Sequence, residues 1–242
     1  MANEIGDHIV KSYDQELKHL HDLIIEMGGL VEHQVADALD SVLNQDTVAG
    51  SQAVESDPRV DQKERDAEQF VIRLLALRQP VAGDLRQIVT SLKITGDLER
   101  IGDYAANIAK RSLVLQQFSI PYALSGLAAM SRLVQEGLKN TLDAFSSNDT
   151  EMALEVWRSD EDIDDLYNGL FRELITYMME DPRNITPCTH LLFIAKNLER
   201  IGDHATNIAE TIYYSVTGES LLAVRPKGDN SPYAVVRTAR DA

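Results

Sequence analysis

The sequence is poor in cysteine, proline and glycine, and it has no long hydrophobic run. Its one cysteine, Cys188, cannot form an intramolecular disulfide, which fits a reducing cytoplasm. No stretch reaches the roughly 18 apolar residues of a membrane-spanning helix, so direct membrane insertion is not expected. The chain starts with MANEIGDHIVK, which lacks the basic and apolar regions of a signal peptide. These absences predict a cytoplasmic protein.

Positive charge is also scarce in this chain. It has 23 Lys and Arg against 39 Asp and Glu, which gives a formal net charge of -16. Such a surface repels phosphate backbones, so we expect no binding of nucleic acid. A negative surface suits cations, basic protein partners or solubility alone, and composition does not choose among the three.

The rarity of breaking residues favours long helices over many short strands. There are only 7 Pro and 13 Gly in 242 residues, and apolar residues recur at helical spacing between them. Asp46 and Asp149 are predicted N-caps, Pro58 is expected to kink or divide its helix, and Pro121 lies near a helix start. The predicted helices span about residues 7–44, 46–78, 80–118, 121–148, 149–181 and 187–217.

An internal repeat organises these helices. The segment LERIGD occurs at residues 98–103 and again at 198–203, and the match continues to Ala109 and Ala209. A weaker upstream match has an offset of 103 residues. A constant offset over separate segments indicates duplication. The chain is therefore predicted to be all-α, with six long antiparallel helices in two tandem three-helix bundles. The predicted domains are residues 1–118 and 119–220, followed by a flexible tail over residues 221–242.

Each copy of the repeated segment places two carboxylates on one helical face. Glu99 and Asp103 are four residues apart, and Glu199 and Asp203 repeat this spacing. Like charges at this spacing destabilise an isolated helix by a few tenths of a kcal/mol. A row that costs stability and occurs twice indicates that a cation or a basic group lies against it.

The preceding helix of each unit carries a second acidic pair. Asp57 and Asp61 are also four residues apart, as are Asp160 and Asp164. If the first hairpin turns near residue 80, Asp61 and Glu99 both lie about 28 Å from the turn. Each hairpin is therefore predicted to gather four carboxylates at one height. The predicted metal ligands are Asp57, Asp61, Glu99 and Asp103 in the first unit, and Asp160, Asp164, Glu199 and Asp203 in the second.

Four carboxylates form an all-oxygen site that suits hard cations. The candidates are Mg²⁺, Mn²⁺, Ca²⁺, iron or Zn²⁺, among which the sequence does not choose, and no organic cofactor is expected. The alternative is that the carboxylates are solvated and paired with neighbouring cations, namely Arg100, Arg200, Lys93 or Lys196. Gly102 and Gly202 lie in the middle of helices, where close helix packing is the simplest explanation for a residue that weakens a helix.

Motifs for catalysis are missing. The sequence has no P-loop, no nucleophile elbow and no zinc-ligand spacing. This favours a protein without enzymatic activity over a metal-dependent phosphohydrolase, which the carboxylate clusters leave as an alternative. A helical scaffold without any ligand is a third possibility.

The repeated motif LERIGD-x-A-x-NIA resembles the signature of the PhoU family of bacterial phosphate-signalling regulators. Further similarities are MGGLVE at residues 27–32, RQP at 78–80 with DLR at 84–86, and TYMMEDPR at 176–183. The resemblance extends over about residues 5–220. It implies two symmetrical three-helix bundles and a cytoplasmic homodimer without catalytic activity.

The resemblance also implies a function. PhoU proteins act as negative regulators of the phosphate starvation response and phosphate uptake. They are thought to link the Pst phosphate ABC transporter, through its ATPase subunit, to a membrane sensor histidine kinase. Some members bind multinuclear metal clusters through E(D)-x-x-x-D motifs, which correspond here to Glu99 with Asp103 and Glu199 with Asp203.

Overall fold

The computed structural model describes residues 2–118 and 125–221, with side chains described from Ser12 on. Within these ranges all regular structure is helical, which confirms the all-α prediction. The elements are α1 (Ala2–Leu43), α2 (Thr47–Arg78), α3 (Ala82–Leu115), α4 (Ser125–Ser147), α5 (Thr150–Arg158), α6 (Asp160–Glu180), the 3-10 helix η1 (Pro182–Asn184) and α7 (Ile185–Thr217).

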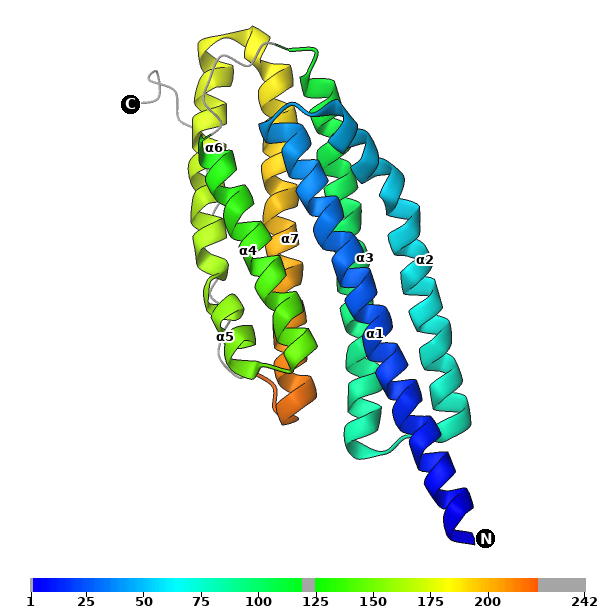
Figure 1. Cartoon of the computed structure of the whole chain (residues 1–242). Helices are drawn as coiled ribbons and strands as arrows, with labels where there is room; N and C mark the ends of the chain where they lie inside the picture. The colour runs from blue at the N-terminus through cyan, green and yellow to red at the C-terminus, as the bar shows by residue number, and fades with distance from the viewer. Residues whose placement is uncertain (1, 119–124, 222–242) are drawn as a thin grey trace.

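The helices form two bundles that lie side by side (Figure 1). Helices α1, α2 and α3 pack on one another, and α4, α5 and α6 pack on α7. The bundles meet where α3 packs on α7 and α1 packs on α4. Helices α3 and α7 run in opposite directions (Figure 1). The two copies of the repeated segment therefore lie on adjacent central helices.

The apolar rows of the repeated segment form the core of both bundles. Ile94, Leu98 and Ile101 of α3 are at most 1% exposed, and so are their counterparts Ile194, Leu198 and Ile201 of α7. Burying one such side chain stabilises the fold by about 1.5–3 kcal/mol. Burial of these apolar residues fixes how each helix is rotated about its axis, and so where the acidic residues of the repeated segment lie.

Local signals in the sequence set the starts of two helices. The Asp46 carboxylate accepts hydrogen bonds from the backbone N–H groups of Val48 and Ala49, at 2.8 and 3.1 Å. Asp149 does the same for Glu151 and Met152, at 3.0 and 3.1 Å. Both predicted N-caps are confirmed, because an aspartate before a helix satisfies amide groups that have no partner inside it.

The prediction of one helix over residues 149–181 is wrong. This segment is divided into α5 and α6 at Ser159, whose hydroxyl donates to the Val156 carbonyl at 2.9 Å. Asp160, Glu161 and Asp162 follow in the first turn of α6, where negative charge favours a helix N-terminus. Pro58, by contrast, lies inside the continuous helix α2 and does not divide it.

Two predictions fall on parts of the chain that the structure leaves aside. Pro121 and the tail from residue 222 lie outside the described residues. The domain boundaries at residues 118 and 220 stay predictions.

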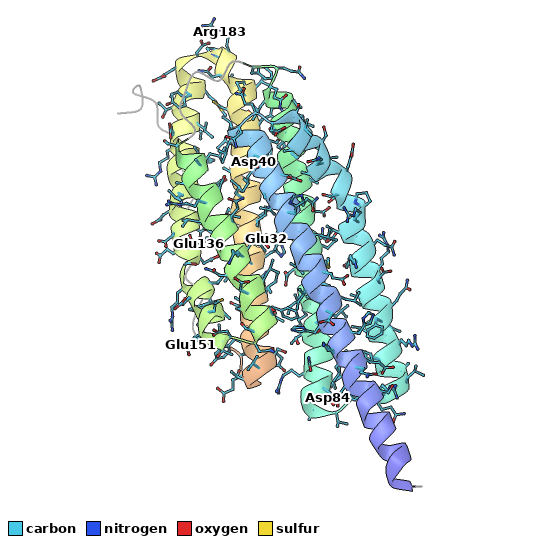
Figure 2. The ribbon with its side chains drawn as sticks, in the orientation of Figure 1. Glu32, Asp40, Asp84, Glu136, Glu151 and Arg183 are labelled. Atoms are coloured by element: carbon cyan, nitrogen blue, oxygen red, sulfur yellow. The ribbon has the colours of Figure 1, made fainter. Side chains whose placement is uncertain are left out.

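Figure 2 shows charged side chains over both bundles, including Glu32 on α1 and Glu136 on α4. None of the helices in the described ranges combines the length and apolarity that crossing a membrane requires.

Candidate functional site

The four predicted carboxylates of the first unit come together between α2 and α3. Burial raises the pKa of Glu99, and the negative charges of Asp103, Glu64 and Asp61 add to this against the opposing charge of Arg100. Burial also raises the pKa of Asp57, and Asp103 and Asp61 contribute in the same direction. Helix α2 therefore presents its acidic pair to the acidic pair of α3, as the equal distances from the turn predicted.

A fifth carboxylate, Glu64, belongs to the same group and was missed in the sequence. Burial is the largest cause that raises the pKa of Glu64, and the negative charges of Glu68 and Asp61 raise it further. Glu64 is three residues after Asp61 and so lies on the same helical face, which is the signal that could have identified it. Together these residues form the first acidic cluster, which consists of Asp57, Asp61, Glu64, Glu99 and Asp103.

Only a few groups offset the charge of the first acidic cluster. The Gln34 amide of α1 donates to Asp57 Oδ1 at 3.2 Å and to the Ala53 carbonyl at 3.0 Å. Arg100 lies 3.5 Å from both Glu99 and Asp103, with 59% of its side chain exposed. Ion pairs that are this open to water contribute little. The cluster is thus an accessible group of carboxylates, and burial raises the pKa of Asp57, Glu64 and Glu99 among them.

The second acidic cluster consists of Asp160 and Asp164 of α6 with Glu199 and Asp203 of α7. It is more deeply placed, because Asp160, Asp164 and Glu199 are only 5%, 5% and 6% exposed. Burial raises the pKa of Glu199, Lys196 opposes this, and Asp203 and Asp164 reinforce it. The Thr206 hydroxyl donates to Asp160 Oδ1 at 3.0 Å.

The second acidic cluster also contains its own cation. Lys196 donates to Glu199 Oε1 at 2.8 Å, and its ammonium lies 4.9 Å from the centre of the Tyr167 ring. The other oxygen, Glu199 Oε2, is buried and has no hydrogen-bond partner among the described residues. A buried carboxylate oxygen left in this way costs free energy. It fits a site that accepts a further cation.

The alternative of local ion pairing is correct in part. Arg100 and Lys196 pair with the clusters, whereas Arg200 lies over the Tyr104 ring, 5.5 Å from its centre. In residues 2–118 and 125–221, no three Asp, Glu, His or Cys side chains are gathered closely enough to hold a metal ion as they stand. Metal binding would therefore require the carboxylates to rotate, and the eight predicted ligands stay a prediction.

The two glycines of the motif allow close packing. A β-carbon at Gly202 would lie 2.8 Å from Ile163 Cδ1, and one at Gly102 would lie 3.0 Å from Gln34 Oε1 and 3.2 Å from Val60 Cγ1. This confirms that both positions bring α3 and α7 close to the helix that carries the second acidic pair. Any larger side chain would widen the distance between the carboxylates.

The seam between α3 and α7 connects the two units. His204 Nδ1 lies 2.7 Å from Asp97 Oδ1, and the His204 ring lies 5.6 Å from the Tyr104 ring. His204 of α7 thus contacts Asp97 and Tyr104 of α3 across the seam.

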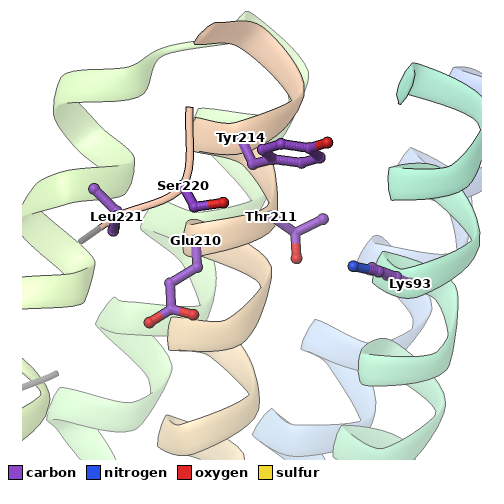
Figure 3. A pocket seen from close by; sticks show the side chains of 6 residues that line it. All are labelled: Lys93, Glu210, Thr211, Tyr214, Ser220 and Leu221. Carbon is purple, nitrogen blue, oxygen red and sulfur yellow. The ribbon is translucent and has the colours of Figure 1, made fainter. Parts of the chain in front are cut away.

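A pocket of about 390 Å³ lies at another part of the seam, and no sequence motif pointed to it. Figure 3 shows Lys93 of α3 reaching towards Thr211 and Tyr214 of α7, with Glu210 below them. The Trp157 indole N–H donates to Glu210 at 2.8 Å. In the repeat, Arg111 corresponds to Thr211, and Phe193 corresponds to Lys93. Arg111 lies over the Phe193 ring, 4.1 Å from its centre, and so fills its position with a long side chain. The shorter Thr211 side chain leaves space at the equivalent position, where the pocket lies.

Comparison with known proteins identifies similar chains over almost the whole length. The model of the PhoU domain matches residues 24–112 and 127–212. A phosphate-specific transport system accessory protein PhoU homolog from Caulobacter vibrioides is 50% identical over 224 residues, which cover 92% of this chain and 97% of that protein. A protein of the same description from Rhizobium meliloti is 50% identical over 223 residues, covering 92% of this chain and 94% of the relative.

Solved structures show the same architecture. The crystal structure of PhoU from Pseudomonas aeruginosa matches with a TM-score of 0.83 and 40% identity, covering 86% of this chain and 100% of that one. The structure of the phosphate transport system regulatory protein PhoU from Streptococcus pneumoniae matches with a TM-score of 0.79 and 32% identity, covering 86% and 99% of the two chains. Both similarities cover most of this chain and almost all of the matched chains.

Proposed function

The chain belongs to the PhoU family, and on this premise we propose that it is a regulatory accessory protein of a phosphate-specific transport system. In this role it restrains phosphate uptake and the phosphate starvation response when phosphate is plentiful. The observation that carries the proposal is 50% identity over more than nine-tenths of both chains to a protein described as such an accessory protein. The first acidic cluster, which is open to solvent, supports a regulatory surface on the first unit.

Deleting the gene tests this function directly. We expect phosphate-starvation genes to be expressed in high phosphate in the deletion strain, and repression to return when the full chain is supplied. Transcript levels of these genes at high and low phosphate are the measurement. Repression in high phosphate that persists in the deletion strain would contradict the proposal.

The proposal includes two protein partners and self-association. The chain, as a cytoplasmic homodimer, would contact the ATPase subunit of the phosphate ABC transporter and a sensor histidine kinase. Its net charge of -16 favours basic surfaces on both partners. Binding of purified ATPase subunit and kinase cytoplasmic domain, measured by surface plasmon resonance at two salt concentrations, tests this. Sedimentation equilibrium of the chain alone tests the dimer.

We further propose that the acidic clusters bind metal ions. The residues that would hold the ion are Asp57, Asp61, Glu99 and Asp103 in one unit, and Asp160, Asp164, Glu199 and Asp203 in the other. The buried Glu199 Oε2 and the raised pKa of Glu99 support this, since a cation would offset both. A bound divalent ion, such as Mg²⁺, Mn²⁺ or iron, would neutralise the carboxylates and tie α2 to α3 or α6 to α7.

Elemental analysis of purified protein tests the metal proposal. The double variant Glu99→Gln with Asp103→Asn is expected to lose the metal of the first unit, and Glu199→Gln with Asp203→Asn that of the second. Glu32→Gln with Asp40→Asn is the matched control, because both residues are exposed on α1 away from the clusters. Equal metal content in all three variants and the wild type would contradict the assignment.

We propose that the protein has no enzymatic activity, in line with relatives that are described as accessory proteins. The feature that favours the alternative, a metal-dependent phosphohydrolase, is the pair of carboxylate clusters, and the sequence carries neither a P-loop nor a nucleophile elbow beside them. Metal-loaded protein is expected to leave p-nitrophenyl phosphate intact. Hydrolysis that disappears in Glu99→Gln would show instead that the first acidic cluster is a catalytic centre.

A further inference from the structure

Exposed apolar residues continue the outer face of α3 beyond the first acidic cluster. Leu85, Val89 and Leu92 are each about two-fifths exposed, although they are large hydrophobic residues. Their spacing of four and three residues places them on one face of the helix. The same face continues through Gly96 to Glu99 and Asp103. One side of α3 is therefore apolar near the α2–α3 turn and acidic further along.

Helix α2 has the same pattern in the opposite chain direction. Its face through Asp57, Asp61 and Glu64 continues to the exposed side chains of Ile72 and Leu75, which lie near the turn. The acidic parts of the two faces are adjacent, since Glu99 interacts electrostatically with Asp61 and Glu64. Both faces thus change from apolar to acidic in the same direction. These outer sides of the two helices together form the α2–α3 face.

The size of this surface matches one helix of a partner. Val89 and Glu99 are ten residues apart on α3, which places the apolar and acidic centres about 15 Å from each other. Leu77 and Val81 extend the apolar part around the turn, and they are 66% and 73% exposed. An apolar area of this kind, next to charge of one sign, is typical of a recognition surface rather than of ordinary solvated surface.

We propose that the α2–α3 face binds an amphipathic helix of a partner protein. That helix would present apolar side chains at spacings of three and four residues near one end, and Lys or Arg on the same side about ten residues further along. Its basic residues would contact Glu99, Asp103 and Glu64. The charges of these carboxylates repel one another, so a basic partner relieves that repulsion as well as adding attraction.

Charge distinguishes this partner from two other occupants. A bilayer with anionic headgroups would be repelled by the acidic part of the face. A second copy of the chain that paired through the same face would bring like charges together, which is unfavourable. A basic helix satisfies both the apolar and the acidic part.

In the second unit, side chains of that unit occupy the corresponding surface. Lys196 occupies the position of Gly96, pairs with Glu199 and lies over the ring of Tyr167, which is the counterpart of Glu64. At Gly96, by contrast, an added β-carbon would meet no atom of the described residues within 4 Å. The first unit therefore leaves open the place where the second carries its own ammonium group. Docking of a basic helix is specific to the first unit.

This inference names a partner surface within the proposed regulatory function and does not depend on bound metal. Its test uses the full chain in EDTA and a synthetic helical peptide as the probe. The peptide has three Leu at i, i+4 and i+7, and three Lys on the same side from i+11 on. Fluorescence anisotropy of the labelled peptide gives the dissociation constant.

Three variants are expected to weaken binding by at least about tenfold. Leu85→Ser with Val89→Ser removes the apolar contact, and Glu99→Gln with Asp103→Asn removes the charge. Gly96→Lys installs the ammonium of the second unit and also favours the helix, so misfolding does not explain a loss. Met179→Ser with Ile185→Ser, two exposed apolar residues of the second unit, is the matched control and should bind like the wild type.

Several results would overturn the inference. Unchanged affinity in Leu85→Ser with Val89→Ser, or equal binding of a peptide with Glu in place of Lys, would exclude this mode of recognition. Co-sedimentation of the wild type with phosphatidylglycerol vesicles, lost in the Leu85 variant, would assign the face to a membrane. A dimer that becomes monomeric in the same variant would assign it to a second copy. None of these results bears on metal content or on repression by the chain.

Discussion

The two acidic clusters begin from the same motif and end in different environments. Both contain an Asp pair on one helix and a Glu-x-x-x-Asp pair on the next. In the first, Gly96 and Glu64 leave the carboxylates exposed, with Arg100 at the edge. In the second, Lys196 and Tyr167 cover them, and Glu199 is only 6% exposed. Residues that differ between the copies therefore decide whether a shared set of carboxylates is open or closed.

The same types of carboxylate therefore form two sites that differ in burial and in the cation beside them. A cation that approaches the first acidic cluster competes with water and an exposed guanidinium. One that approaches the second competes with Lys196, which already holds one Glu199 oxygen. We therefore expect the first cluster to exchange cations or basic partners, and the second to hold its helices together.

Removing the cation of each cluster gives the largest expected contrast. Lys196→Met should destabilise the protein by about 2 kcal/mol, because it leaves Glu199 buried beside Asp164 and Asp203 without its counter-charge. Arg100→Met should change the free energy of unfolding by less than about 0.5 kcal/mol, since its ion pairs are exposed. Urea denaturation at pH 7 in EDTA measures both. Equal losses would mean that the two clusters are equally exposed.

The next largest contrast concerns the hydrogen bonds that uncharged side chains donate to the two clusters. Thr206→Val removes the hydroxyl that donates to buried Asp160 and should cost about 1.5 kcal/mol. Gln34→Leu removes the amide that donates to Asp57, and about 1 kcal/mol is expected because Asp57 is more exposed and can bind water instead. Thermal unfolding ranks the two variants. A larger loss in Gln34→Leu would contradict the order of burial.

The pH dependence of the two glutamates separates the clusters further. The pKa of Glu99 is raised in the folded state, so its folded form binds a proton more readily, and stability falls as pH rises above about 4.5. Glu99→Gln should therefore stabilise the metal-free protein by about 0.5 kcal/mol at pH 7, with no gain at pH 4. Glu199→Gln should bring no gain, because it also removes the negative charge that pairs with Lys196. Denaturation curves between pH 4 and 8 check both.

The smallest expected contrast concerns the motif glycines. Alanine at either position favours the helix by about 1 kcal/mol but meets a neighbour. At Gly202 the neighbour is the end of the Ile163 side chain, which can rotate, whereas at Gly102 it is Gln34 together with the stiff Val60. Gly102→Ala should therefore be less stable than Gly202→Ala by about 0.5 kcal/mol. The reverse order in calorimetry would show that the second bundle is packed more rigidly than the first.

Much of the fold could be predicted from short-range patterns, and the errors have a common cause. Asp46 and Asp149 cap their helices because an N-cap acts on amides only two and three residues away. The break at Ser159 was missed, and the possible division at Pro58 did not occur, because both depend on how the whole helix packs. Glu64 was overlooked although its spacing places it beside Asp61.

The sequence by itself determined the helical class, the duplication and the acidic pairs that each unit carries. These follow from a helical period of 3.6 residues and from a motif that recurs along the chain. Tertiary structure alone decided that Lys196 rather than Arg200 neutralises the second cluster, and that His204 joins Asp97 across the seam. Lys196 is only three residues from Glu199, but the pairing depends on how packing buries Glu199. His204 and Asp97 are 107 residues apart, so only the packing of α3 on α7 brings them together.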